Sequence, residues 1–300
     1  MQNVLITGSG GFLGKYLVNH LSAQNTLHTL SRSNSNFYSI DLATQIPVIT
    51  TKYNLVVHAA GKAHSIPKSK EEAEDFYTVN ELGTRHLCQG FENAGLYPDH
   101  FVFISSVAVY GLETGNMINE ESPLLGKSPY AKSKINTELF LESWCNNKPV
   151  KLTILRLPLI AGINPPGNLG SMIRAINKNR YFNIGRGDAR KSMVLAEDVA
   201  KAIPFAAAAG GTYNLTDGSN CTMATLSKLI AKQLGKPDPK SIPVWLAKLI
   251  AFVGNIYGQS APLNTSKLTK LMCTLTFDDT KARKAFGWNS RPVYDHLTIN

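Results

Sequence analysis

The residues with the clearest chemical potential are a tyrosine and a lysine four positions apart. Tyr130 and Lys134 begin a stretch, residues 130–145, whose pattern predicts a helix, and residues with this spacing share one helix face. The lysine ammonium can then stabilise a tyrosinate, so that the tyrosine acts as an acid and a base near neutral pH. Ser106, after a short apolar run, can hydrogen-bond the same substrate oxygen. We interpret Ser106, Tyr130 and Lys134 as a set that exchanges a proton with a substrate hydroxyl, although the spacing alone is also common on solvated helices.

Three glycines lie three residues apart where a strand is expected to give way to a helix: Gly8, Gly11 and Gly14. Without side chains, the turn can tighten and a pyrophosphate can approach the start of the helix. An ordinary tight turn would use the same glycines. Because this turn follows the first strand, we predict a dinucleotide site, with Phe12 and Leu13 among its contacts, and hydride exchange with a nicotinamide.

The end of the second expected strand reads Ser31-Arg32-Ser33. In a dinucleotide site this position holds an acid for the ribose 2′-hydroxyl or a base for a 2′-phosphate. No acid occurs before Asp41, so Arg32 can pair with a 2′-phosphate and favours NADP(H). The alternative for Arg32 is a solvated loop cation. Asp41 and Leu42 are expected to contact the adenine.

The elements that must position these residues alternate along the first half of the chain. Apolar runs predict strands at residues 4–6, 26–30, 55–57, 101–104 and 152–155, and amphipathic stretches predict helices at 12–21, 71–93 and 130–145. This order predicts an α/β fold with a Rossmann-type doubly wound parallel sheet. After residue 157, prolines and glycines interrupt the pattern. We therefore expect a dinucleotide-binding domain at 1–157 and a smaller mixed α/β substrate region at 158–300, closely packed and exchanging segments with the first.

The charge is distributed unevenly over the 300 residues. The net charge is +10, with 11 bases and 13 acids up to residue 150 (net −2) and 20 bases and 8 acids after it (net +12). No recognised nucleic-acid motif accompanies this excess, so we expect no nucleic-acid partner. Four scattered cysteines, without a C-x-x-C pair, predict neither a metal site nor a disulfide framework. With no secretion signal read at the N-terminus, a cytoplasmic location is expected.

The longest apolar stretch, residues 242–257, is interrupted by Lys248 and is too short to span a bilayer. Trp245, Leu249 and Phe252 recur within it at helical spacing. This spacing predicts a buried or dimer-packing stripe. Docking on an anionic membrane surface is the less favoured alternative.

Together the motifs resemble those of the extended short-chain dehydrogenase/reductase superfamily, specifically its nucleotide-sugar epimerases, dehydratases and 4-ketoreductases. The matching segments run in order along the chain. Residues 7–14 (TGSGGFLG) resemble the family's phosphate-binding turn, Ala59 and Ala60 its fourth-strand cofactor segment, and Asn80 the helix that follows. Residues 105–111 (SSVAVYG) resemble the strand end that carries the catalytic serine, Tyr130 and Lys134 the catalytic pair, and residues 279–288 the C-terminal signature. Residues 58–64 also resemble a subgroup of polysaccharide-assembly proteins.

The resemblance implies a substrate in which a sugar is linked to a nucleoside diphosphate, most simply a UDP-sugar. Arg190 matches the arginine that holds the diphosphate, and Asn168 matches a nearby polar contact. The implied reaction is 4-epimerisation with retained NAD or 4-keto-sugar reduction with NADPH, in surface polysaccharide synthesis and by a homodimer. Dehydration fits less well, because Val107 and Ala108 follow Ser106 where that chemistry uses an acid pair. A non-catalytic dinucleotide-binding regulator is the alternative from another class.

Overall fold

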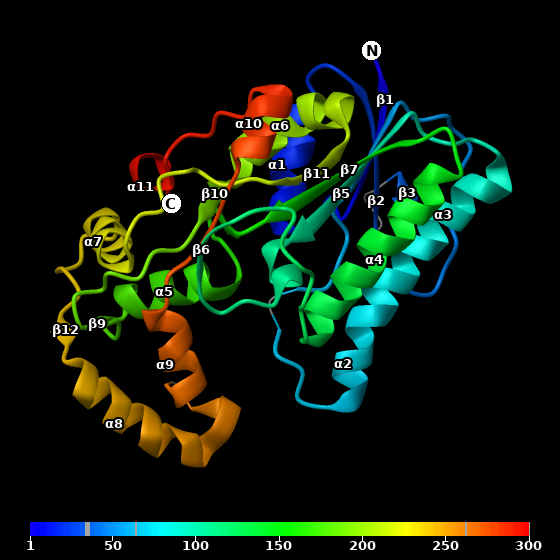
Figure 1. Cartoon of the computed structure of the whole chain (residues 1–300). Coiled ribbons are helices and arrows are strands. Elements are labelled where there is room, and N and C mark those ends of the chain that lie inside the picture. The colour runs from blue at the N-terminus through cyan, green and yellow to red at the C-terminus, as the bar shows by residue number, and fades with distance from the viewer. Residues whose placement is uncertain (34–36, 64, 262, 300) are drawn as a thin grey trace.

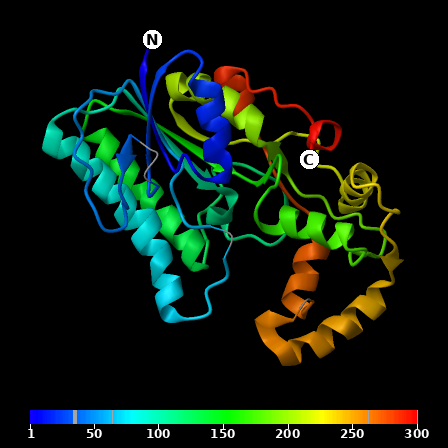
Figure 2. The same cartoon turned by 180° about the vertical axis from the view of Figure 1, so that it is seen from behind.

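The computed structural model describes residues 1–33, 37–63, 65–261 and 263–299 (Figure 1), so His64 of the stretch 58–64 lies outside the described residues. Within these ranges a central sheet with helices on both faces carries a smaller lobe built from later parts of the chain. The view from behind shows that this lobe extends to one side of the sheet (Figure 2).

The central sheet confirms the predicted fold class. Seven parallel strands formed by the described residues follow the order β11-β7-β5-β4-β1-β2-β3. Their bounds are β1 Asn3–Thr7, β2 Thr26–Ser31, β3 Tyr38–Ser39, β4 Leu55–His58, β5 His100–Ser106, β7 Lys151–Leu157 and β11 Gly211–Asn214. Both faces of a parallel sheet are covered, which explains why β4 reads as a continuous apolar run. The order reverses beside β1, which is where such sheets bind ligands.

Helices cover the two faces in two groups. α1 (Phe12–Leu21), α6 (Ala196–Ala209) and α10 (Thr280–Phe286) pack on one face, and α2 (Lys70–Phe76), α3 (Gly83–Ala94) and α4 (Pro129–Asn146) lie on the other (Figures 1 and 2). The helix expected at 71–93 is interrupted, because η1 (Tyr77–Leu82) between α2 and α3 is a π-helical segment. Such segments are rare and frequently occur at functional sites.

The start of α4 is well defined by its sequence. The Ser128 hydroxyl accepts a hydrogen bond from the Ala131 amide at 3.1 Å, and Pro129 occupies the first helical turn. A capping serine followed by proline is a strong helix start signal, because both relieve the unpaired amides of the first turn. Tyr130 and Lys134 are thereby placed on the first two turns of a firmly capped helix.

The smaller lobe consists of short strand pairs and helices. The parallel pairs are β8 (Leu159–Ala161) with β10 (Met193–Leu195), β9 (Asn183–Ile184) with β12 (Ser241–Ile242), and β6 (Gly115–Ile118) with β13 (Leu275–Phe277). Its helices are α5 (Gly167–Asn177), α7 (Met223–Gln233), α8 (Val244–Gly254), η3 (Asn255–Ser260), α9 (Thr265–Met272) and α11 (Val293–His296). The short helix η2 (Val107–Tyr110) directly follows β5 of the central sheet. β11 and β13 tie this later part of the chain to the first: β11 extends the central sheet beside β7, and β13 pairs with β6.

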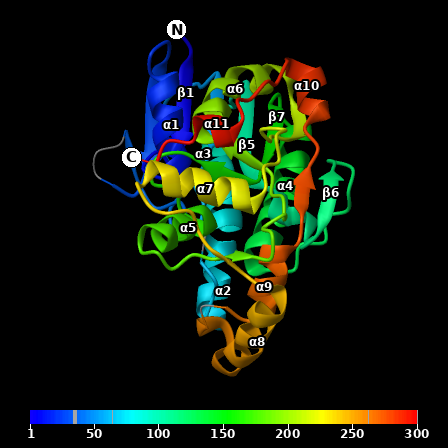
Figure 3. The ribbon, with the colours of Figure 1, turned by 90° about the vertical axis from the view of Figure 1, so that its left-hand side faces the viewer.

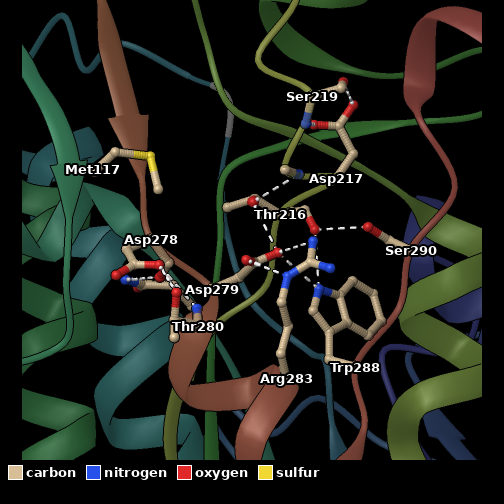
Figure 4. Close-up of polar contacts among 12 residues, drawn as sticks. Met117, Thr216, Asp217, Ser219, Asp278, Asp279, Thr280, Arg283, Trp288 and Ser290 are labelled. Atoms are coloured by element: carbon tan, nitrogen blue, oxygen red, sulfur yellow. Dashed lines mark hydrogen bonds and ion pairs between the residues drawn. The ribbon is translucent and has the colours of Figure 1, made fainter.

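The C-terminal segment is locked to the end of β11 by polar contacts (Figure 4). The Asp279 carboxylate accepts from the Thr216 hydroxyl at 3.2 Å, from Arg283 Nε at 2.8 Å and from Trp288 Nε1 at 3.2 Å. Trp288 Nε1 also donates to the Thr216 carbonyl at 2.9 Å, and the Ser290 hydroxyl donates to the same oxygen at 2.8 Å. The signature at 279–288 therefore fastens the end of the chain to the central sheet.

The predicted burial of the stripe on residues 242–257 is wrong for the single chain. Trp245, Leu249 and Phe252 are 68%, 55% and 71% exposed. α8 instead buries its small residues, Ala247 and Ala251, against Leu268 of α9.

Candidate active site

Ser106 and Tyr130 meet at the carboxyl end of the central sheet. Ser106 ends β5, and Tyr130 lies in the first turn of α4. The Ser106 Oγ accepts from the Ala108 amide at 3.2 Å, and its hydroxyl lies close enough to the Tyr130 phenol to affect the pKa of Tyr130. Burial raises the pKa of Tyr130, and the nearby Ser106 hydroxyl opposes that rise. The serine therefore stabilises the phenolate, which is the form that would accept a proton.

Lys134 lies deeper in the same site. Its side chain is buried, and Nζ donates to the Ile104 carbonyl at 2.8 Å and lies 4.5 Å from the centre of the Phe103 ring. Burial lowers the pKa of Lys134 to about 8, against the opposing charge of Glu138. The predicted support of a tyrosinate by Lys134 stays a prediction, since the ammonium is directed at a β5 carbonyl in this structure.

A buried ion pair below Lys134 was not anticipated from the sequence. Glu138, one turn after Lys134, accepts from Arg156 Nη2 at 2.7 Å and from Nε at 3.2 Å, and the Ser105 hydroxyl also donates to it. Arg156 Nη1 donates to the Tyr110 hydroxyl at 3.1 Å. The network links α4, β5 and β7 under the site. The i, i+4 spacing of Lys134 and Glu138 was the available signal, since it places both on one helix face.

The glycine turn fits a dinucleotide. Gly8 has a φ of 71°, and a Cβ there would lie 2.6 Å from the Ala60 amide nitrogen. A Cβ on Gly14 would lie 2.1 Å from the Gly8 carbonyl oxygen, and the Gly11 amide donates to that oxygen at 2.9 Å. No side chain caps the start of α1, where Phe12 and Leu13 stand. A tight turn that ends at an uncapped helix start can receive a pyrophosphate.

A chain of buried side chains holds the strand ends beside this turn. The Thr7 hydroxyl lies 2.6 Å from His58 Nδ1, and His58 Nε2 lies 2.8 Å from the Thr84 hydroxyl. Burial and the charge of Lys134 lower the pKa of His58 to about 3, so the imidazole is neutral near pH 7. The Ala60 amide donates to Thr7 Oγ1 at 3.2 Å. These contacts fix Ala59 and Ala60 against Gly8.

Asn80 lies in the π-helical segment η1 and joins three elements. Its Oδ1 accepts from the Lys62 amide at 2.7 Å, and its Nδ2 donates to the Lys62 carbonyl at 3.1 Å and to Ser133 Oγ at 2.9 Å. A Cβ on Gly61 would lie 3.0 Å from Asn80 Oδ1 and 3.5 Å from Lys134 Nζ. Asn80 therefore holds the loop after β4 against α4, close to Lys134.

The three remaining predicted cofactor residues follow β2. Arg32 is exposed directly after this strand, whose Leu30 carbonyl accepts from the Gly8 amide at 3.0 Å. Leu42 is buried, and its carbonyl oxygen lies 2.6 Å from His86 Nδ1. Asp41 Oδ1 accepts from the Ala43 amide at 3.0 Å. Arg32 thus stands at the strand end next to the glycine turn.

The two predicted substrate residues lie in the smaller lobe. Asn168 is exposed on the first turn of α5, and Arg190 is exposed with Nη1 donating to the Asn220 carbonyl at 2.9 Å. Neither contacts Ser106, Tyr130 or Lys134 among the hydrogen bonds and ion pairs of the described residues. A cavity of about 190 Å³ is lined by residues 181–189, which directly precede Arg190 in the sequence, and by Met223, Val244, Leu271 and Met272. Across the described part of the chain, no helix is long and apolar enough to cross a membrane.

The doubly wound sheet and the glycine turn are those of the extended short-chain dehydrogenase/reductase class, whose enzymes use NAD(P). The sequence pattern of the "NAD dependent epimerase/dehydratase family" matches residues 4–216, and the chain belongs to that family. The resemblance deduced from the motifs is thereby confirmed.

Individual relatives cover nearly the whole chain. An N-acetyl-alpha-D-glucosaminyl-diphospho-ditrans,octacis-undecaprenol 4-epimerase of Escherichia coli O157:H7 is 29% identical over 95% of this chain and 89% of its own. A UDP-glucose 4-epimerase of Vibrio cholerae is 25% identical over 96% and 90%. The structure of the UDP-Glc/GlcNAc 4-epimerase from Campylobacter jejuni superimposes with a TM-score of 0.76 at 19% identity, over 97% of this chain and 95% of that one, and so shares the fold.

Proposed function

We propose that this enzyme is an NAD(P)-dependent 4-epimerase or 4-keto-reductase of diphosphate-linked sugars, in particular UDP-sugars, acting in surface polysaccharide synthesis. The observation that carries the proposal is the juxtaposition of Ser106, at the end of β5, and Tyr130, in the first turn of α4, with Lys134 one turn further on. Support comes from two relatives whose names state 4-epimerisation of a diphosphate-linked sugar. The basic second half, in which Arg190 directly follows the cavity-lining segment 181–189, suits a diphosphate.

The proposed chemistry divides between the cofactor and the protein. When bound, the nicotinamide supplies the acceptor and donor of hydride at sugar C4. Tyr130 takes the proton of the C4 hydroxyl as that carbon is oxidised and returns a proton to the oxygen as the carbonyl is reduced. Ser106 donates a hydrogen bond that stabilises the phenolate form, and Lys134 holds positive charge close to the reacting atoms.

The test of this proposal is a Tyr130→Phe variant. Conversion of UDP-glucose, UDP-N-acetylglucosamine and the undecaprenyl-diphosphate-linked sugar is followed by NMR, with Tyr97→Phe as the matched control. Loss of a general acid and base lowers turnover by roughly 10²–10⁴-fold. Retained turnover in Tyr130→Phe would refute the assignment. If the native protein binds NADPH but converts none of these sugars or their 4-keto derivatives, the regulator alternative is favoured instead.

We further propose that Arg32 makes the enzyme prefer NADP(H) over NAD(H) by binding the 2′-phosphate of the cofactor. A charge-assisted hydrogen bond contributes about 1.5–3 kcal/mol, which corresponds to roughly 10–100-fold in affinity. Arg32→Ala should therefore weaken NADPH binding by this factor and leave NADH binding unchanged. Equal effects on both cofactors, or tightly retained NAD in the purified enzyme, would contradict this selection and favour epimerisation with NAD.

A further inference from the structure

The helix α8 has its large and small apolar residues on opposite sides. Trp245, Leu249 and Phe252 recur at intervals of four and three residues, which places them on one side of α8, and Ile256 follows in η3. These four side chains are 55% to 81% exposed. The side that packs on the protein carries Ala247, Ala251 and Gly254 instead. Large apolar side chains exposed together on one side of a helix, while alanine and glycine are buried, are typical of an interaction surface.

The exposed residues form one surface at the end of the molecule. Ile250 and Val253, 45% and 50% exposed, widen the stripe on one flank. We call these six residues the α8 face: Trp245, Leu249, Ile250, Phe252, Val253 and Ile256. α8 and α9 lie at the outer end of the smaller lobe, far from the N-terminal strand of the sheet (Figures 1 and 3). A flat partner can therefore approach the α8 face without meeting the central sheet.

The charged side chains of the segment that contains the α8 face all have one sign. Residues 239–277 contain four lysines, Lys240, Lys248, Lys267 and Lys270, and no aspartate or glutamate. Lys270 forms an ion pair with Glu113 at 3.3 Å. Lys240 and Lys248 are exposed, and neither forms an ion pair with a residue that the structure describes. Their charge is available to an anionic partner.

We propose that the α8 face docks on the surface of an anionic phospholipid bilayer, with its apolar side chains in the acyl boundary and the lysines against the headgroups. Helices that lie in the plane of a membrane combine Trp, Phe and Leu on one face with basic residues beside it. A second copy of the chain fits the face less well. A two-fold interface sets the same patch against itself, so the lysines of residues 239–277 would meet a segment that contains no carboxylate of its own.

Docking would also place the cavity of the smaller lobe at the membrane. Val244 at the start of α8 and Leu271 and Met272 at the end of α9 form part of the cavity wall. A sugar diphosphate carried on a lipid could therefore reach this cavity without leaving the bilayer surface.

Tryptophan fluorescence tests the docking directly. Of the three tryptophans, Trp144 and Trp288 are buried at 7% and 5% exposure, whereas Trp245 is exposed. Vesicles of phosphatidylcholine mixed with phosphatidylglycerol should shift the emission to the blue and carry the protein with them in flotation. Both effects should weaken in high salt and with phosphatidylcholine alone, because salt screens the lysines and neutral lipid lacks the charge that they bind.

Paired variants distinguish vesicle binding by the α8 face from non-specific binding by other parts of the surface. Phe252→Ser should lower the vesicle partition coefficient roughly tenfold, because a mostly exposed phenylalanine no longer enters the acyl boundary. Lys248→Glu should lower it roughly fivefold or more. The controls are Phe205→Ser, at a 63% exposed phenylalanine on α6, and Lys284→Glu on α10, which changes the net charge equally. Both controls should bind as the native protein does.

Three results would overturn the proposal. The first is an unchanged emission spectrum and no flotation with anionic vesicles. The second is an equal loss of binding in Phe252→Ser and Phe205→Ser. The third is a blue-shifted emission of Trp245 in the absence of lipid, together with a doubling of the mass at high protein concentration that Phe252→Ser abolishes. This result would assign the α8 face to a second copy of the chain. None of these measurements depends on turnover, so they are independent of the proposed reaction.

Discussion

Replacing Glu138 by glutamine should destabilise the fold much more than its conservative chemistry suggests. The carboxylate is 1% exposed and holds Arg156 through contacts of 2.7 Å and 3.2 Å. Burial lowers the pKa of Arg156, but the bonds and charge of Glu138 more than reverse this effect, so the pKa is raised. Glu138→Gln removes the negative charge and leaves the buried guanidinium with neutral acceptors: the glutamine amide oxygen, the Tyr110 hydroxyl and the Glu120 carbonyl.

The expected loss follows from that uncompensated charge. Removing one partner of a buried ion pair costs about 3–5 kcal/mol, a large part of the roughly 5–15 kcal/mol by which domains are stable. Arginine cannot relieve the cost by deprotonation. Urea unfolding followed by circular dichroism measures the loss, with Glu142→Gln as the control, because Glu142 is exposed one turn further along the same helix. This control should stay within about 0.5 kcal/mol of the native protein.

A double-mutant cycle identifies the cause. If the ion pair is responsible, the losses of Glu138→Gln and Arg156→Met measured singly should together exceed the loss of the double variant by about 1 kcal/mol or more. Strict additivity, or a Glu138→Gln loss no larger than that of Glu142→Gln, would refute the reasoning.

Two further predictions concern the cofactor turn and Lys134. Gly14→Ala should raise the Kd for NADPH at least tenfold (~1.4 kcal/mol), since its Cβ would lie 2.1 Å from the Gly8 carbonyl oxygen. Gly10→Ala, with nothing within 4 Å of its Cβ, should not, and equal effects in a fluorescence titration would contradict the assigned geometry. Because the pKa of Lys134 falls from 10.5 to about 8 on folding, the unfolded chain binds more protons between these pH values. The native protein should therefore gain about 3 kcal/mol of stability relative to Lys134→Met as the pH rises from 8 to 10.5. Unfolding curves whose difference is constant over this range would disprove it.

The glycine spacing and the alternating elements predict five of the seven strands that the described residues form in the central sheet, because local sequence determines where strands, turns and helix caps form. The same local information predicted that Tyr130 and Lys134 share a face, and Ser106 was placed at the end of its strand. The sequence does not predict β3 and β11. A strand as short as Tyr38–Ser39 shows no periodicity, and β11 lies after residue 157, where prolines and glycines interrupt the alternating pattern.

Two features depend on contacts that spacing does not encode. Periodicity shows that Trp245, Leu249 and Phe252 lie on one side of a helix, but not whether that side faces the protein. The small residues Ala247 and Ala251 form a second stripe with the same period, and packing selected that one. Glu138 and Arg156 are of types usually found exposed, so their burial became visible only in the folded chain.

The late entry of β11 into the sheet has a consequence for synthesis of the chain. β7 ends at Leu157, and its outer edge is unpaired until β11, residues 211–214, has left the ribosome. An unpaired edge strand is a template for association with other chains. More than fifty residues are therefore synthesised after β7 before β11 can pair with it. During that time the incomplete sheet of the nascent chain can aggregate or bind a chaperone.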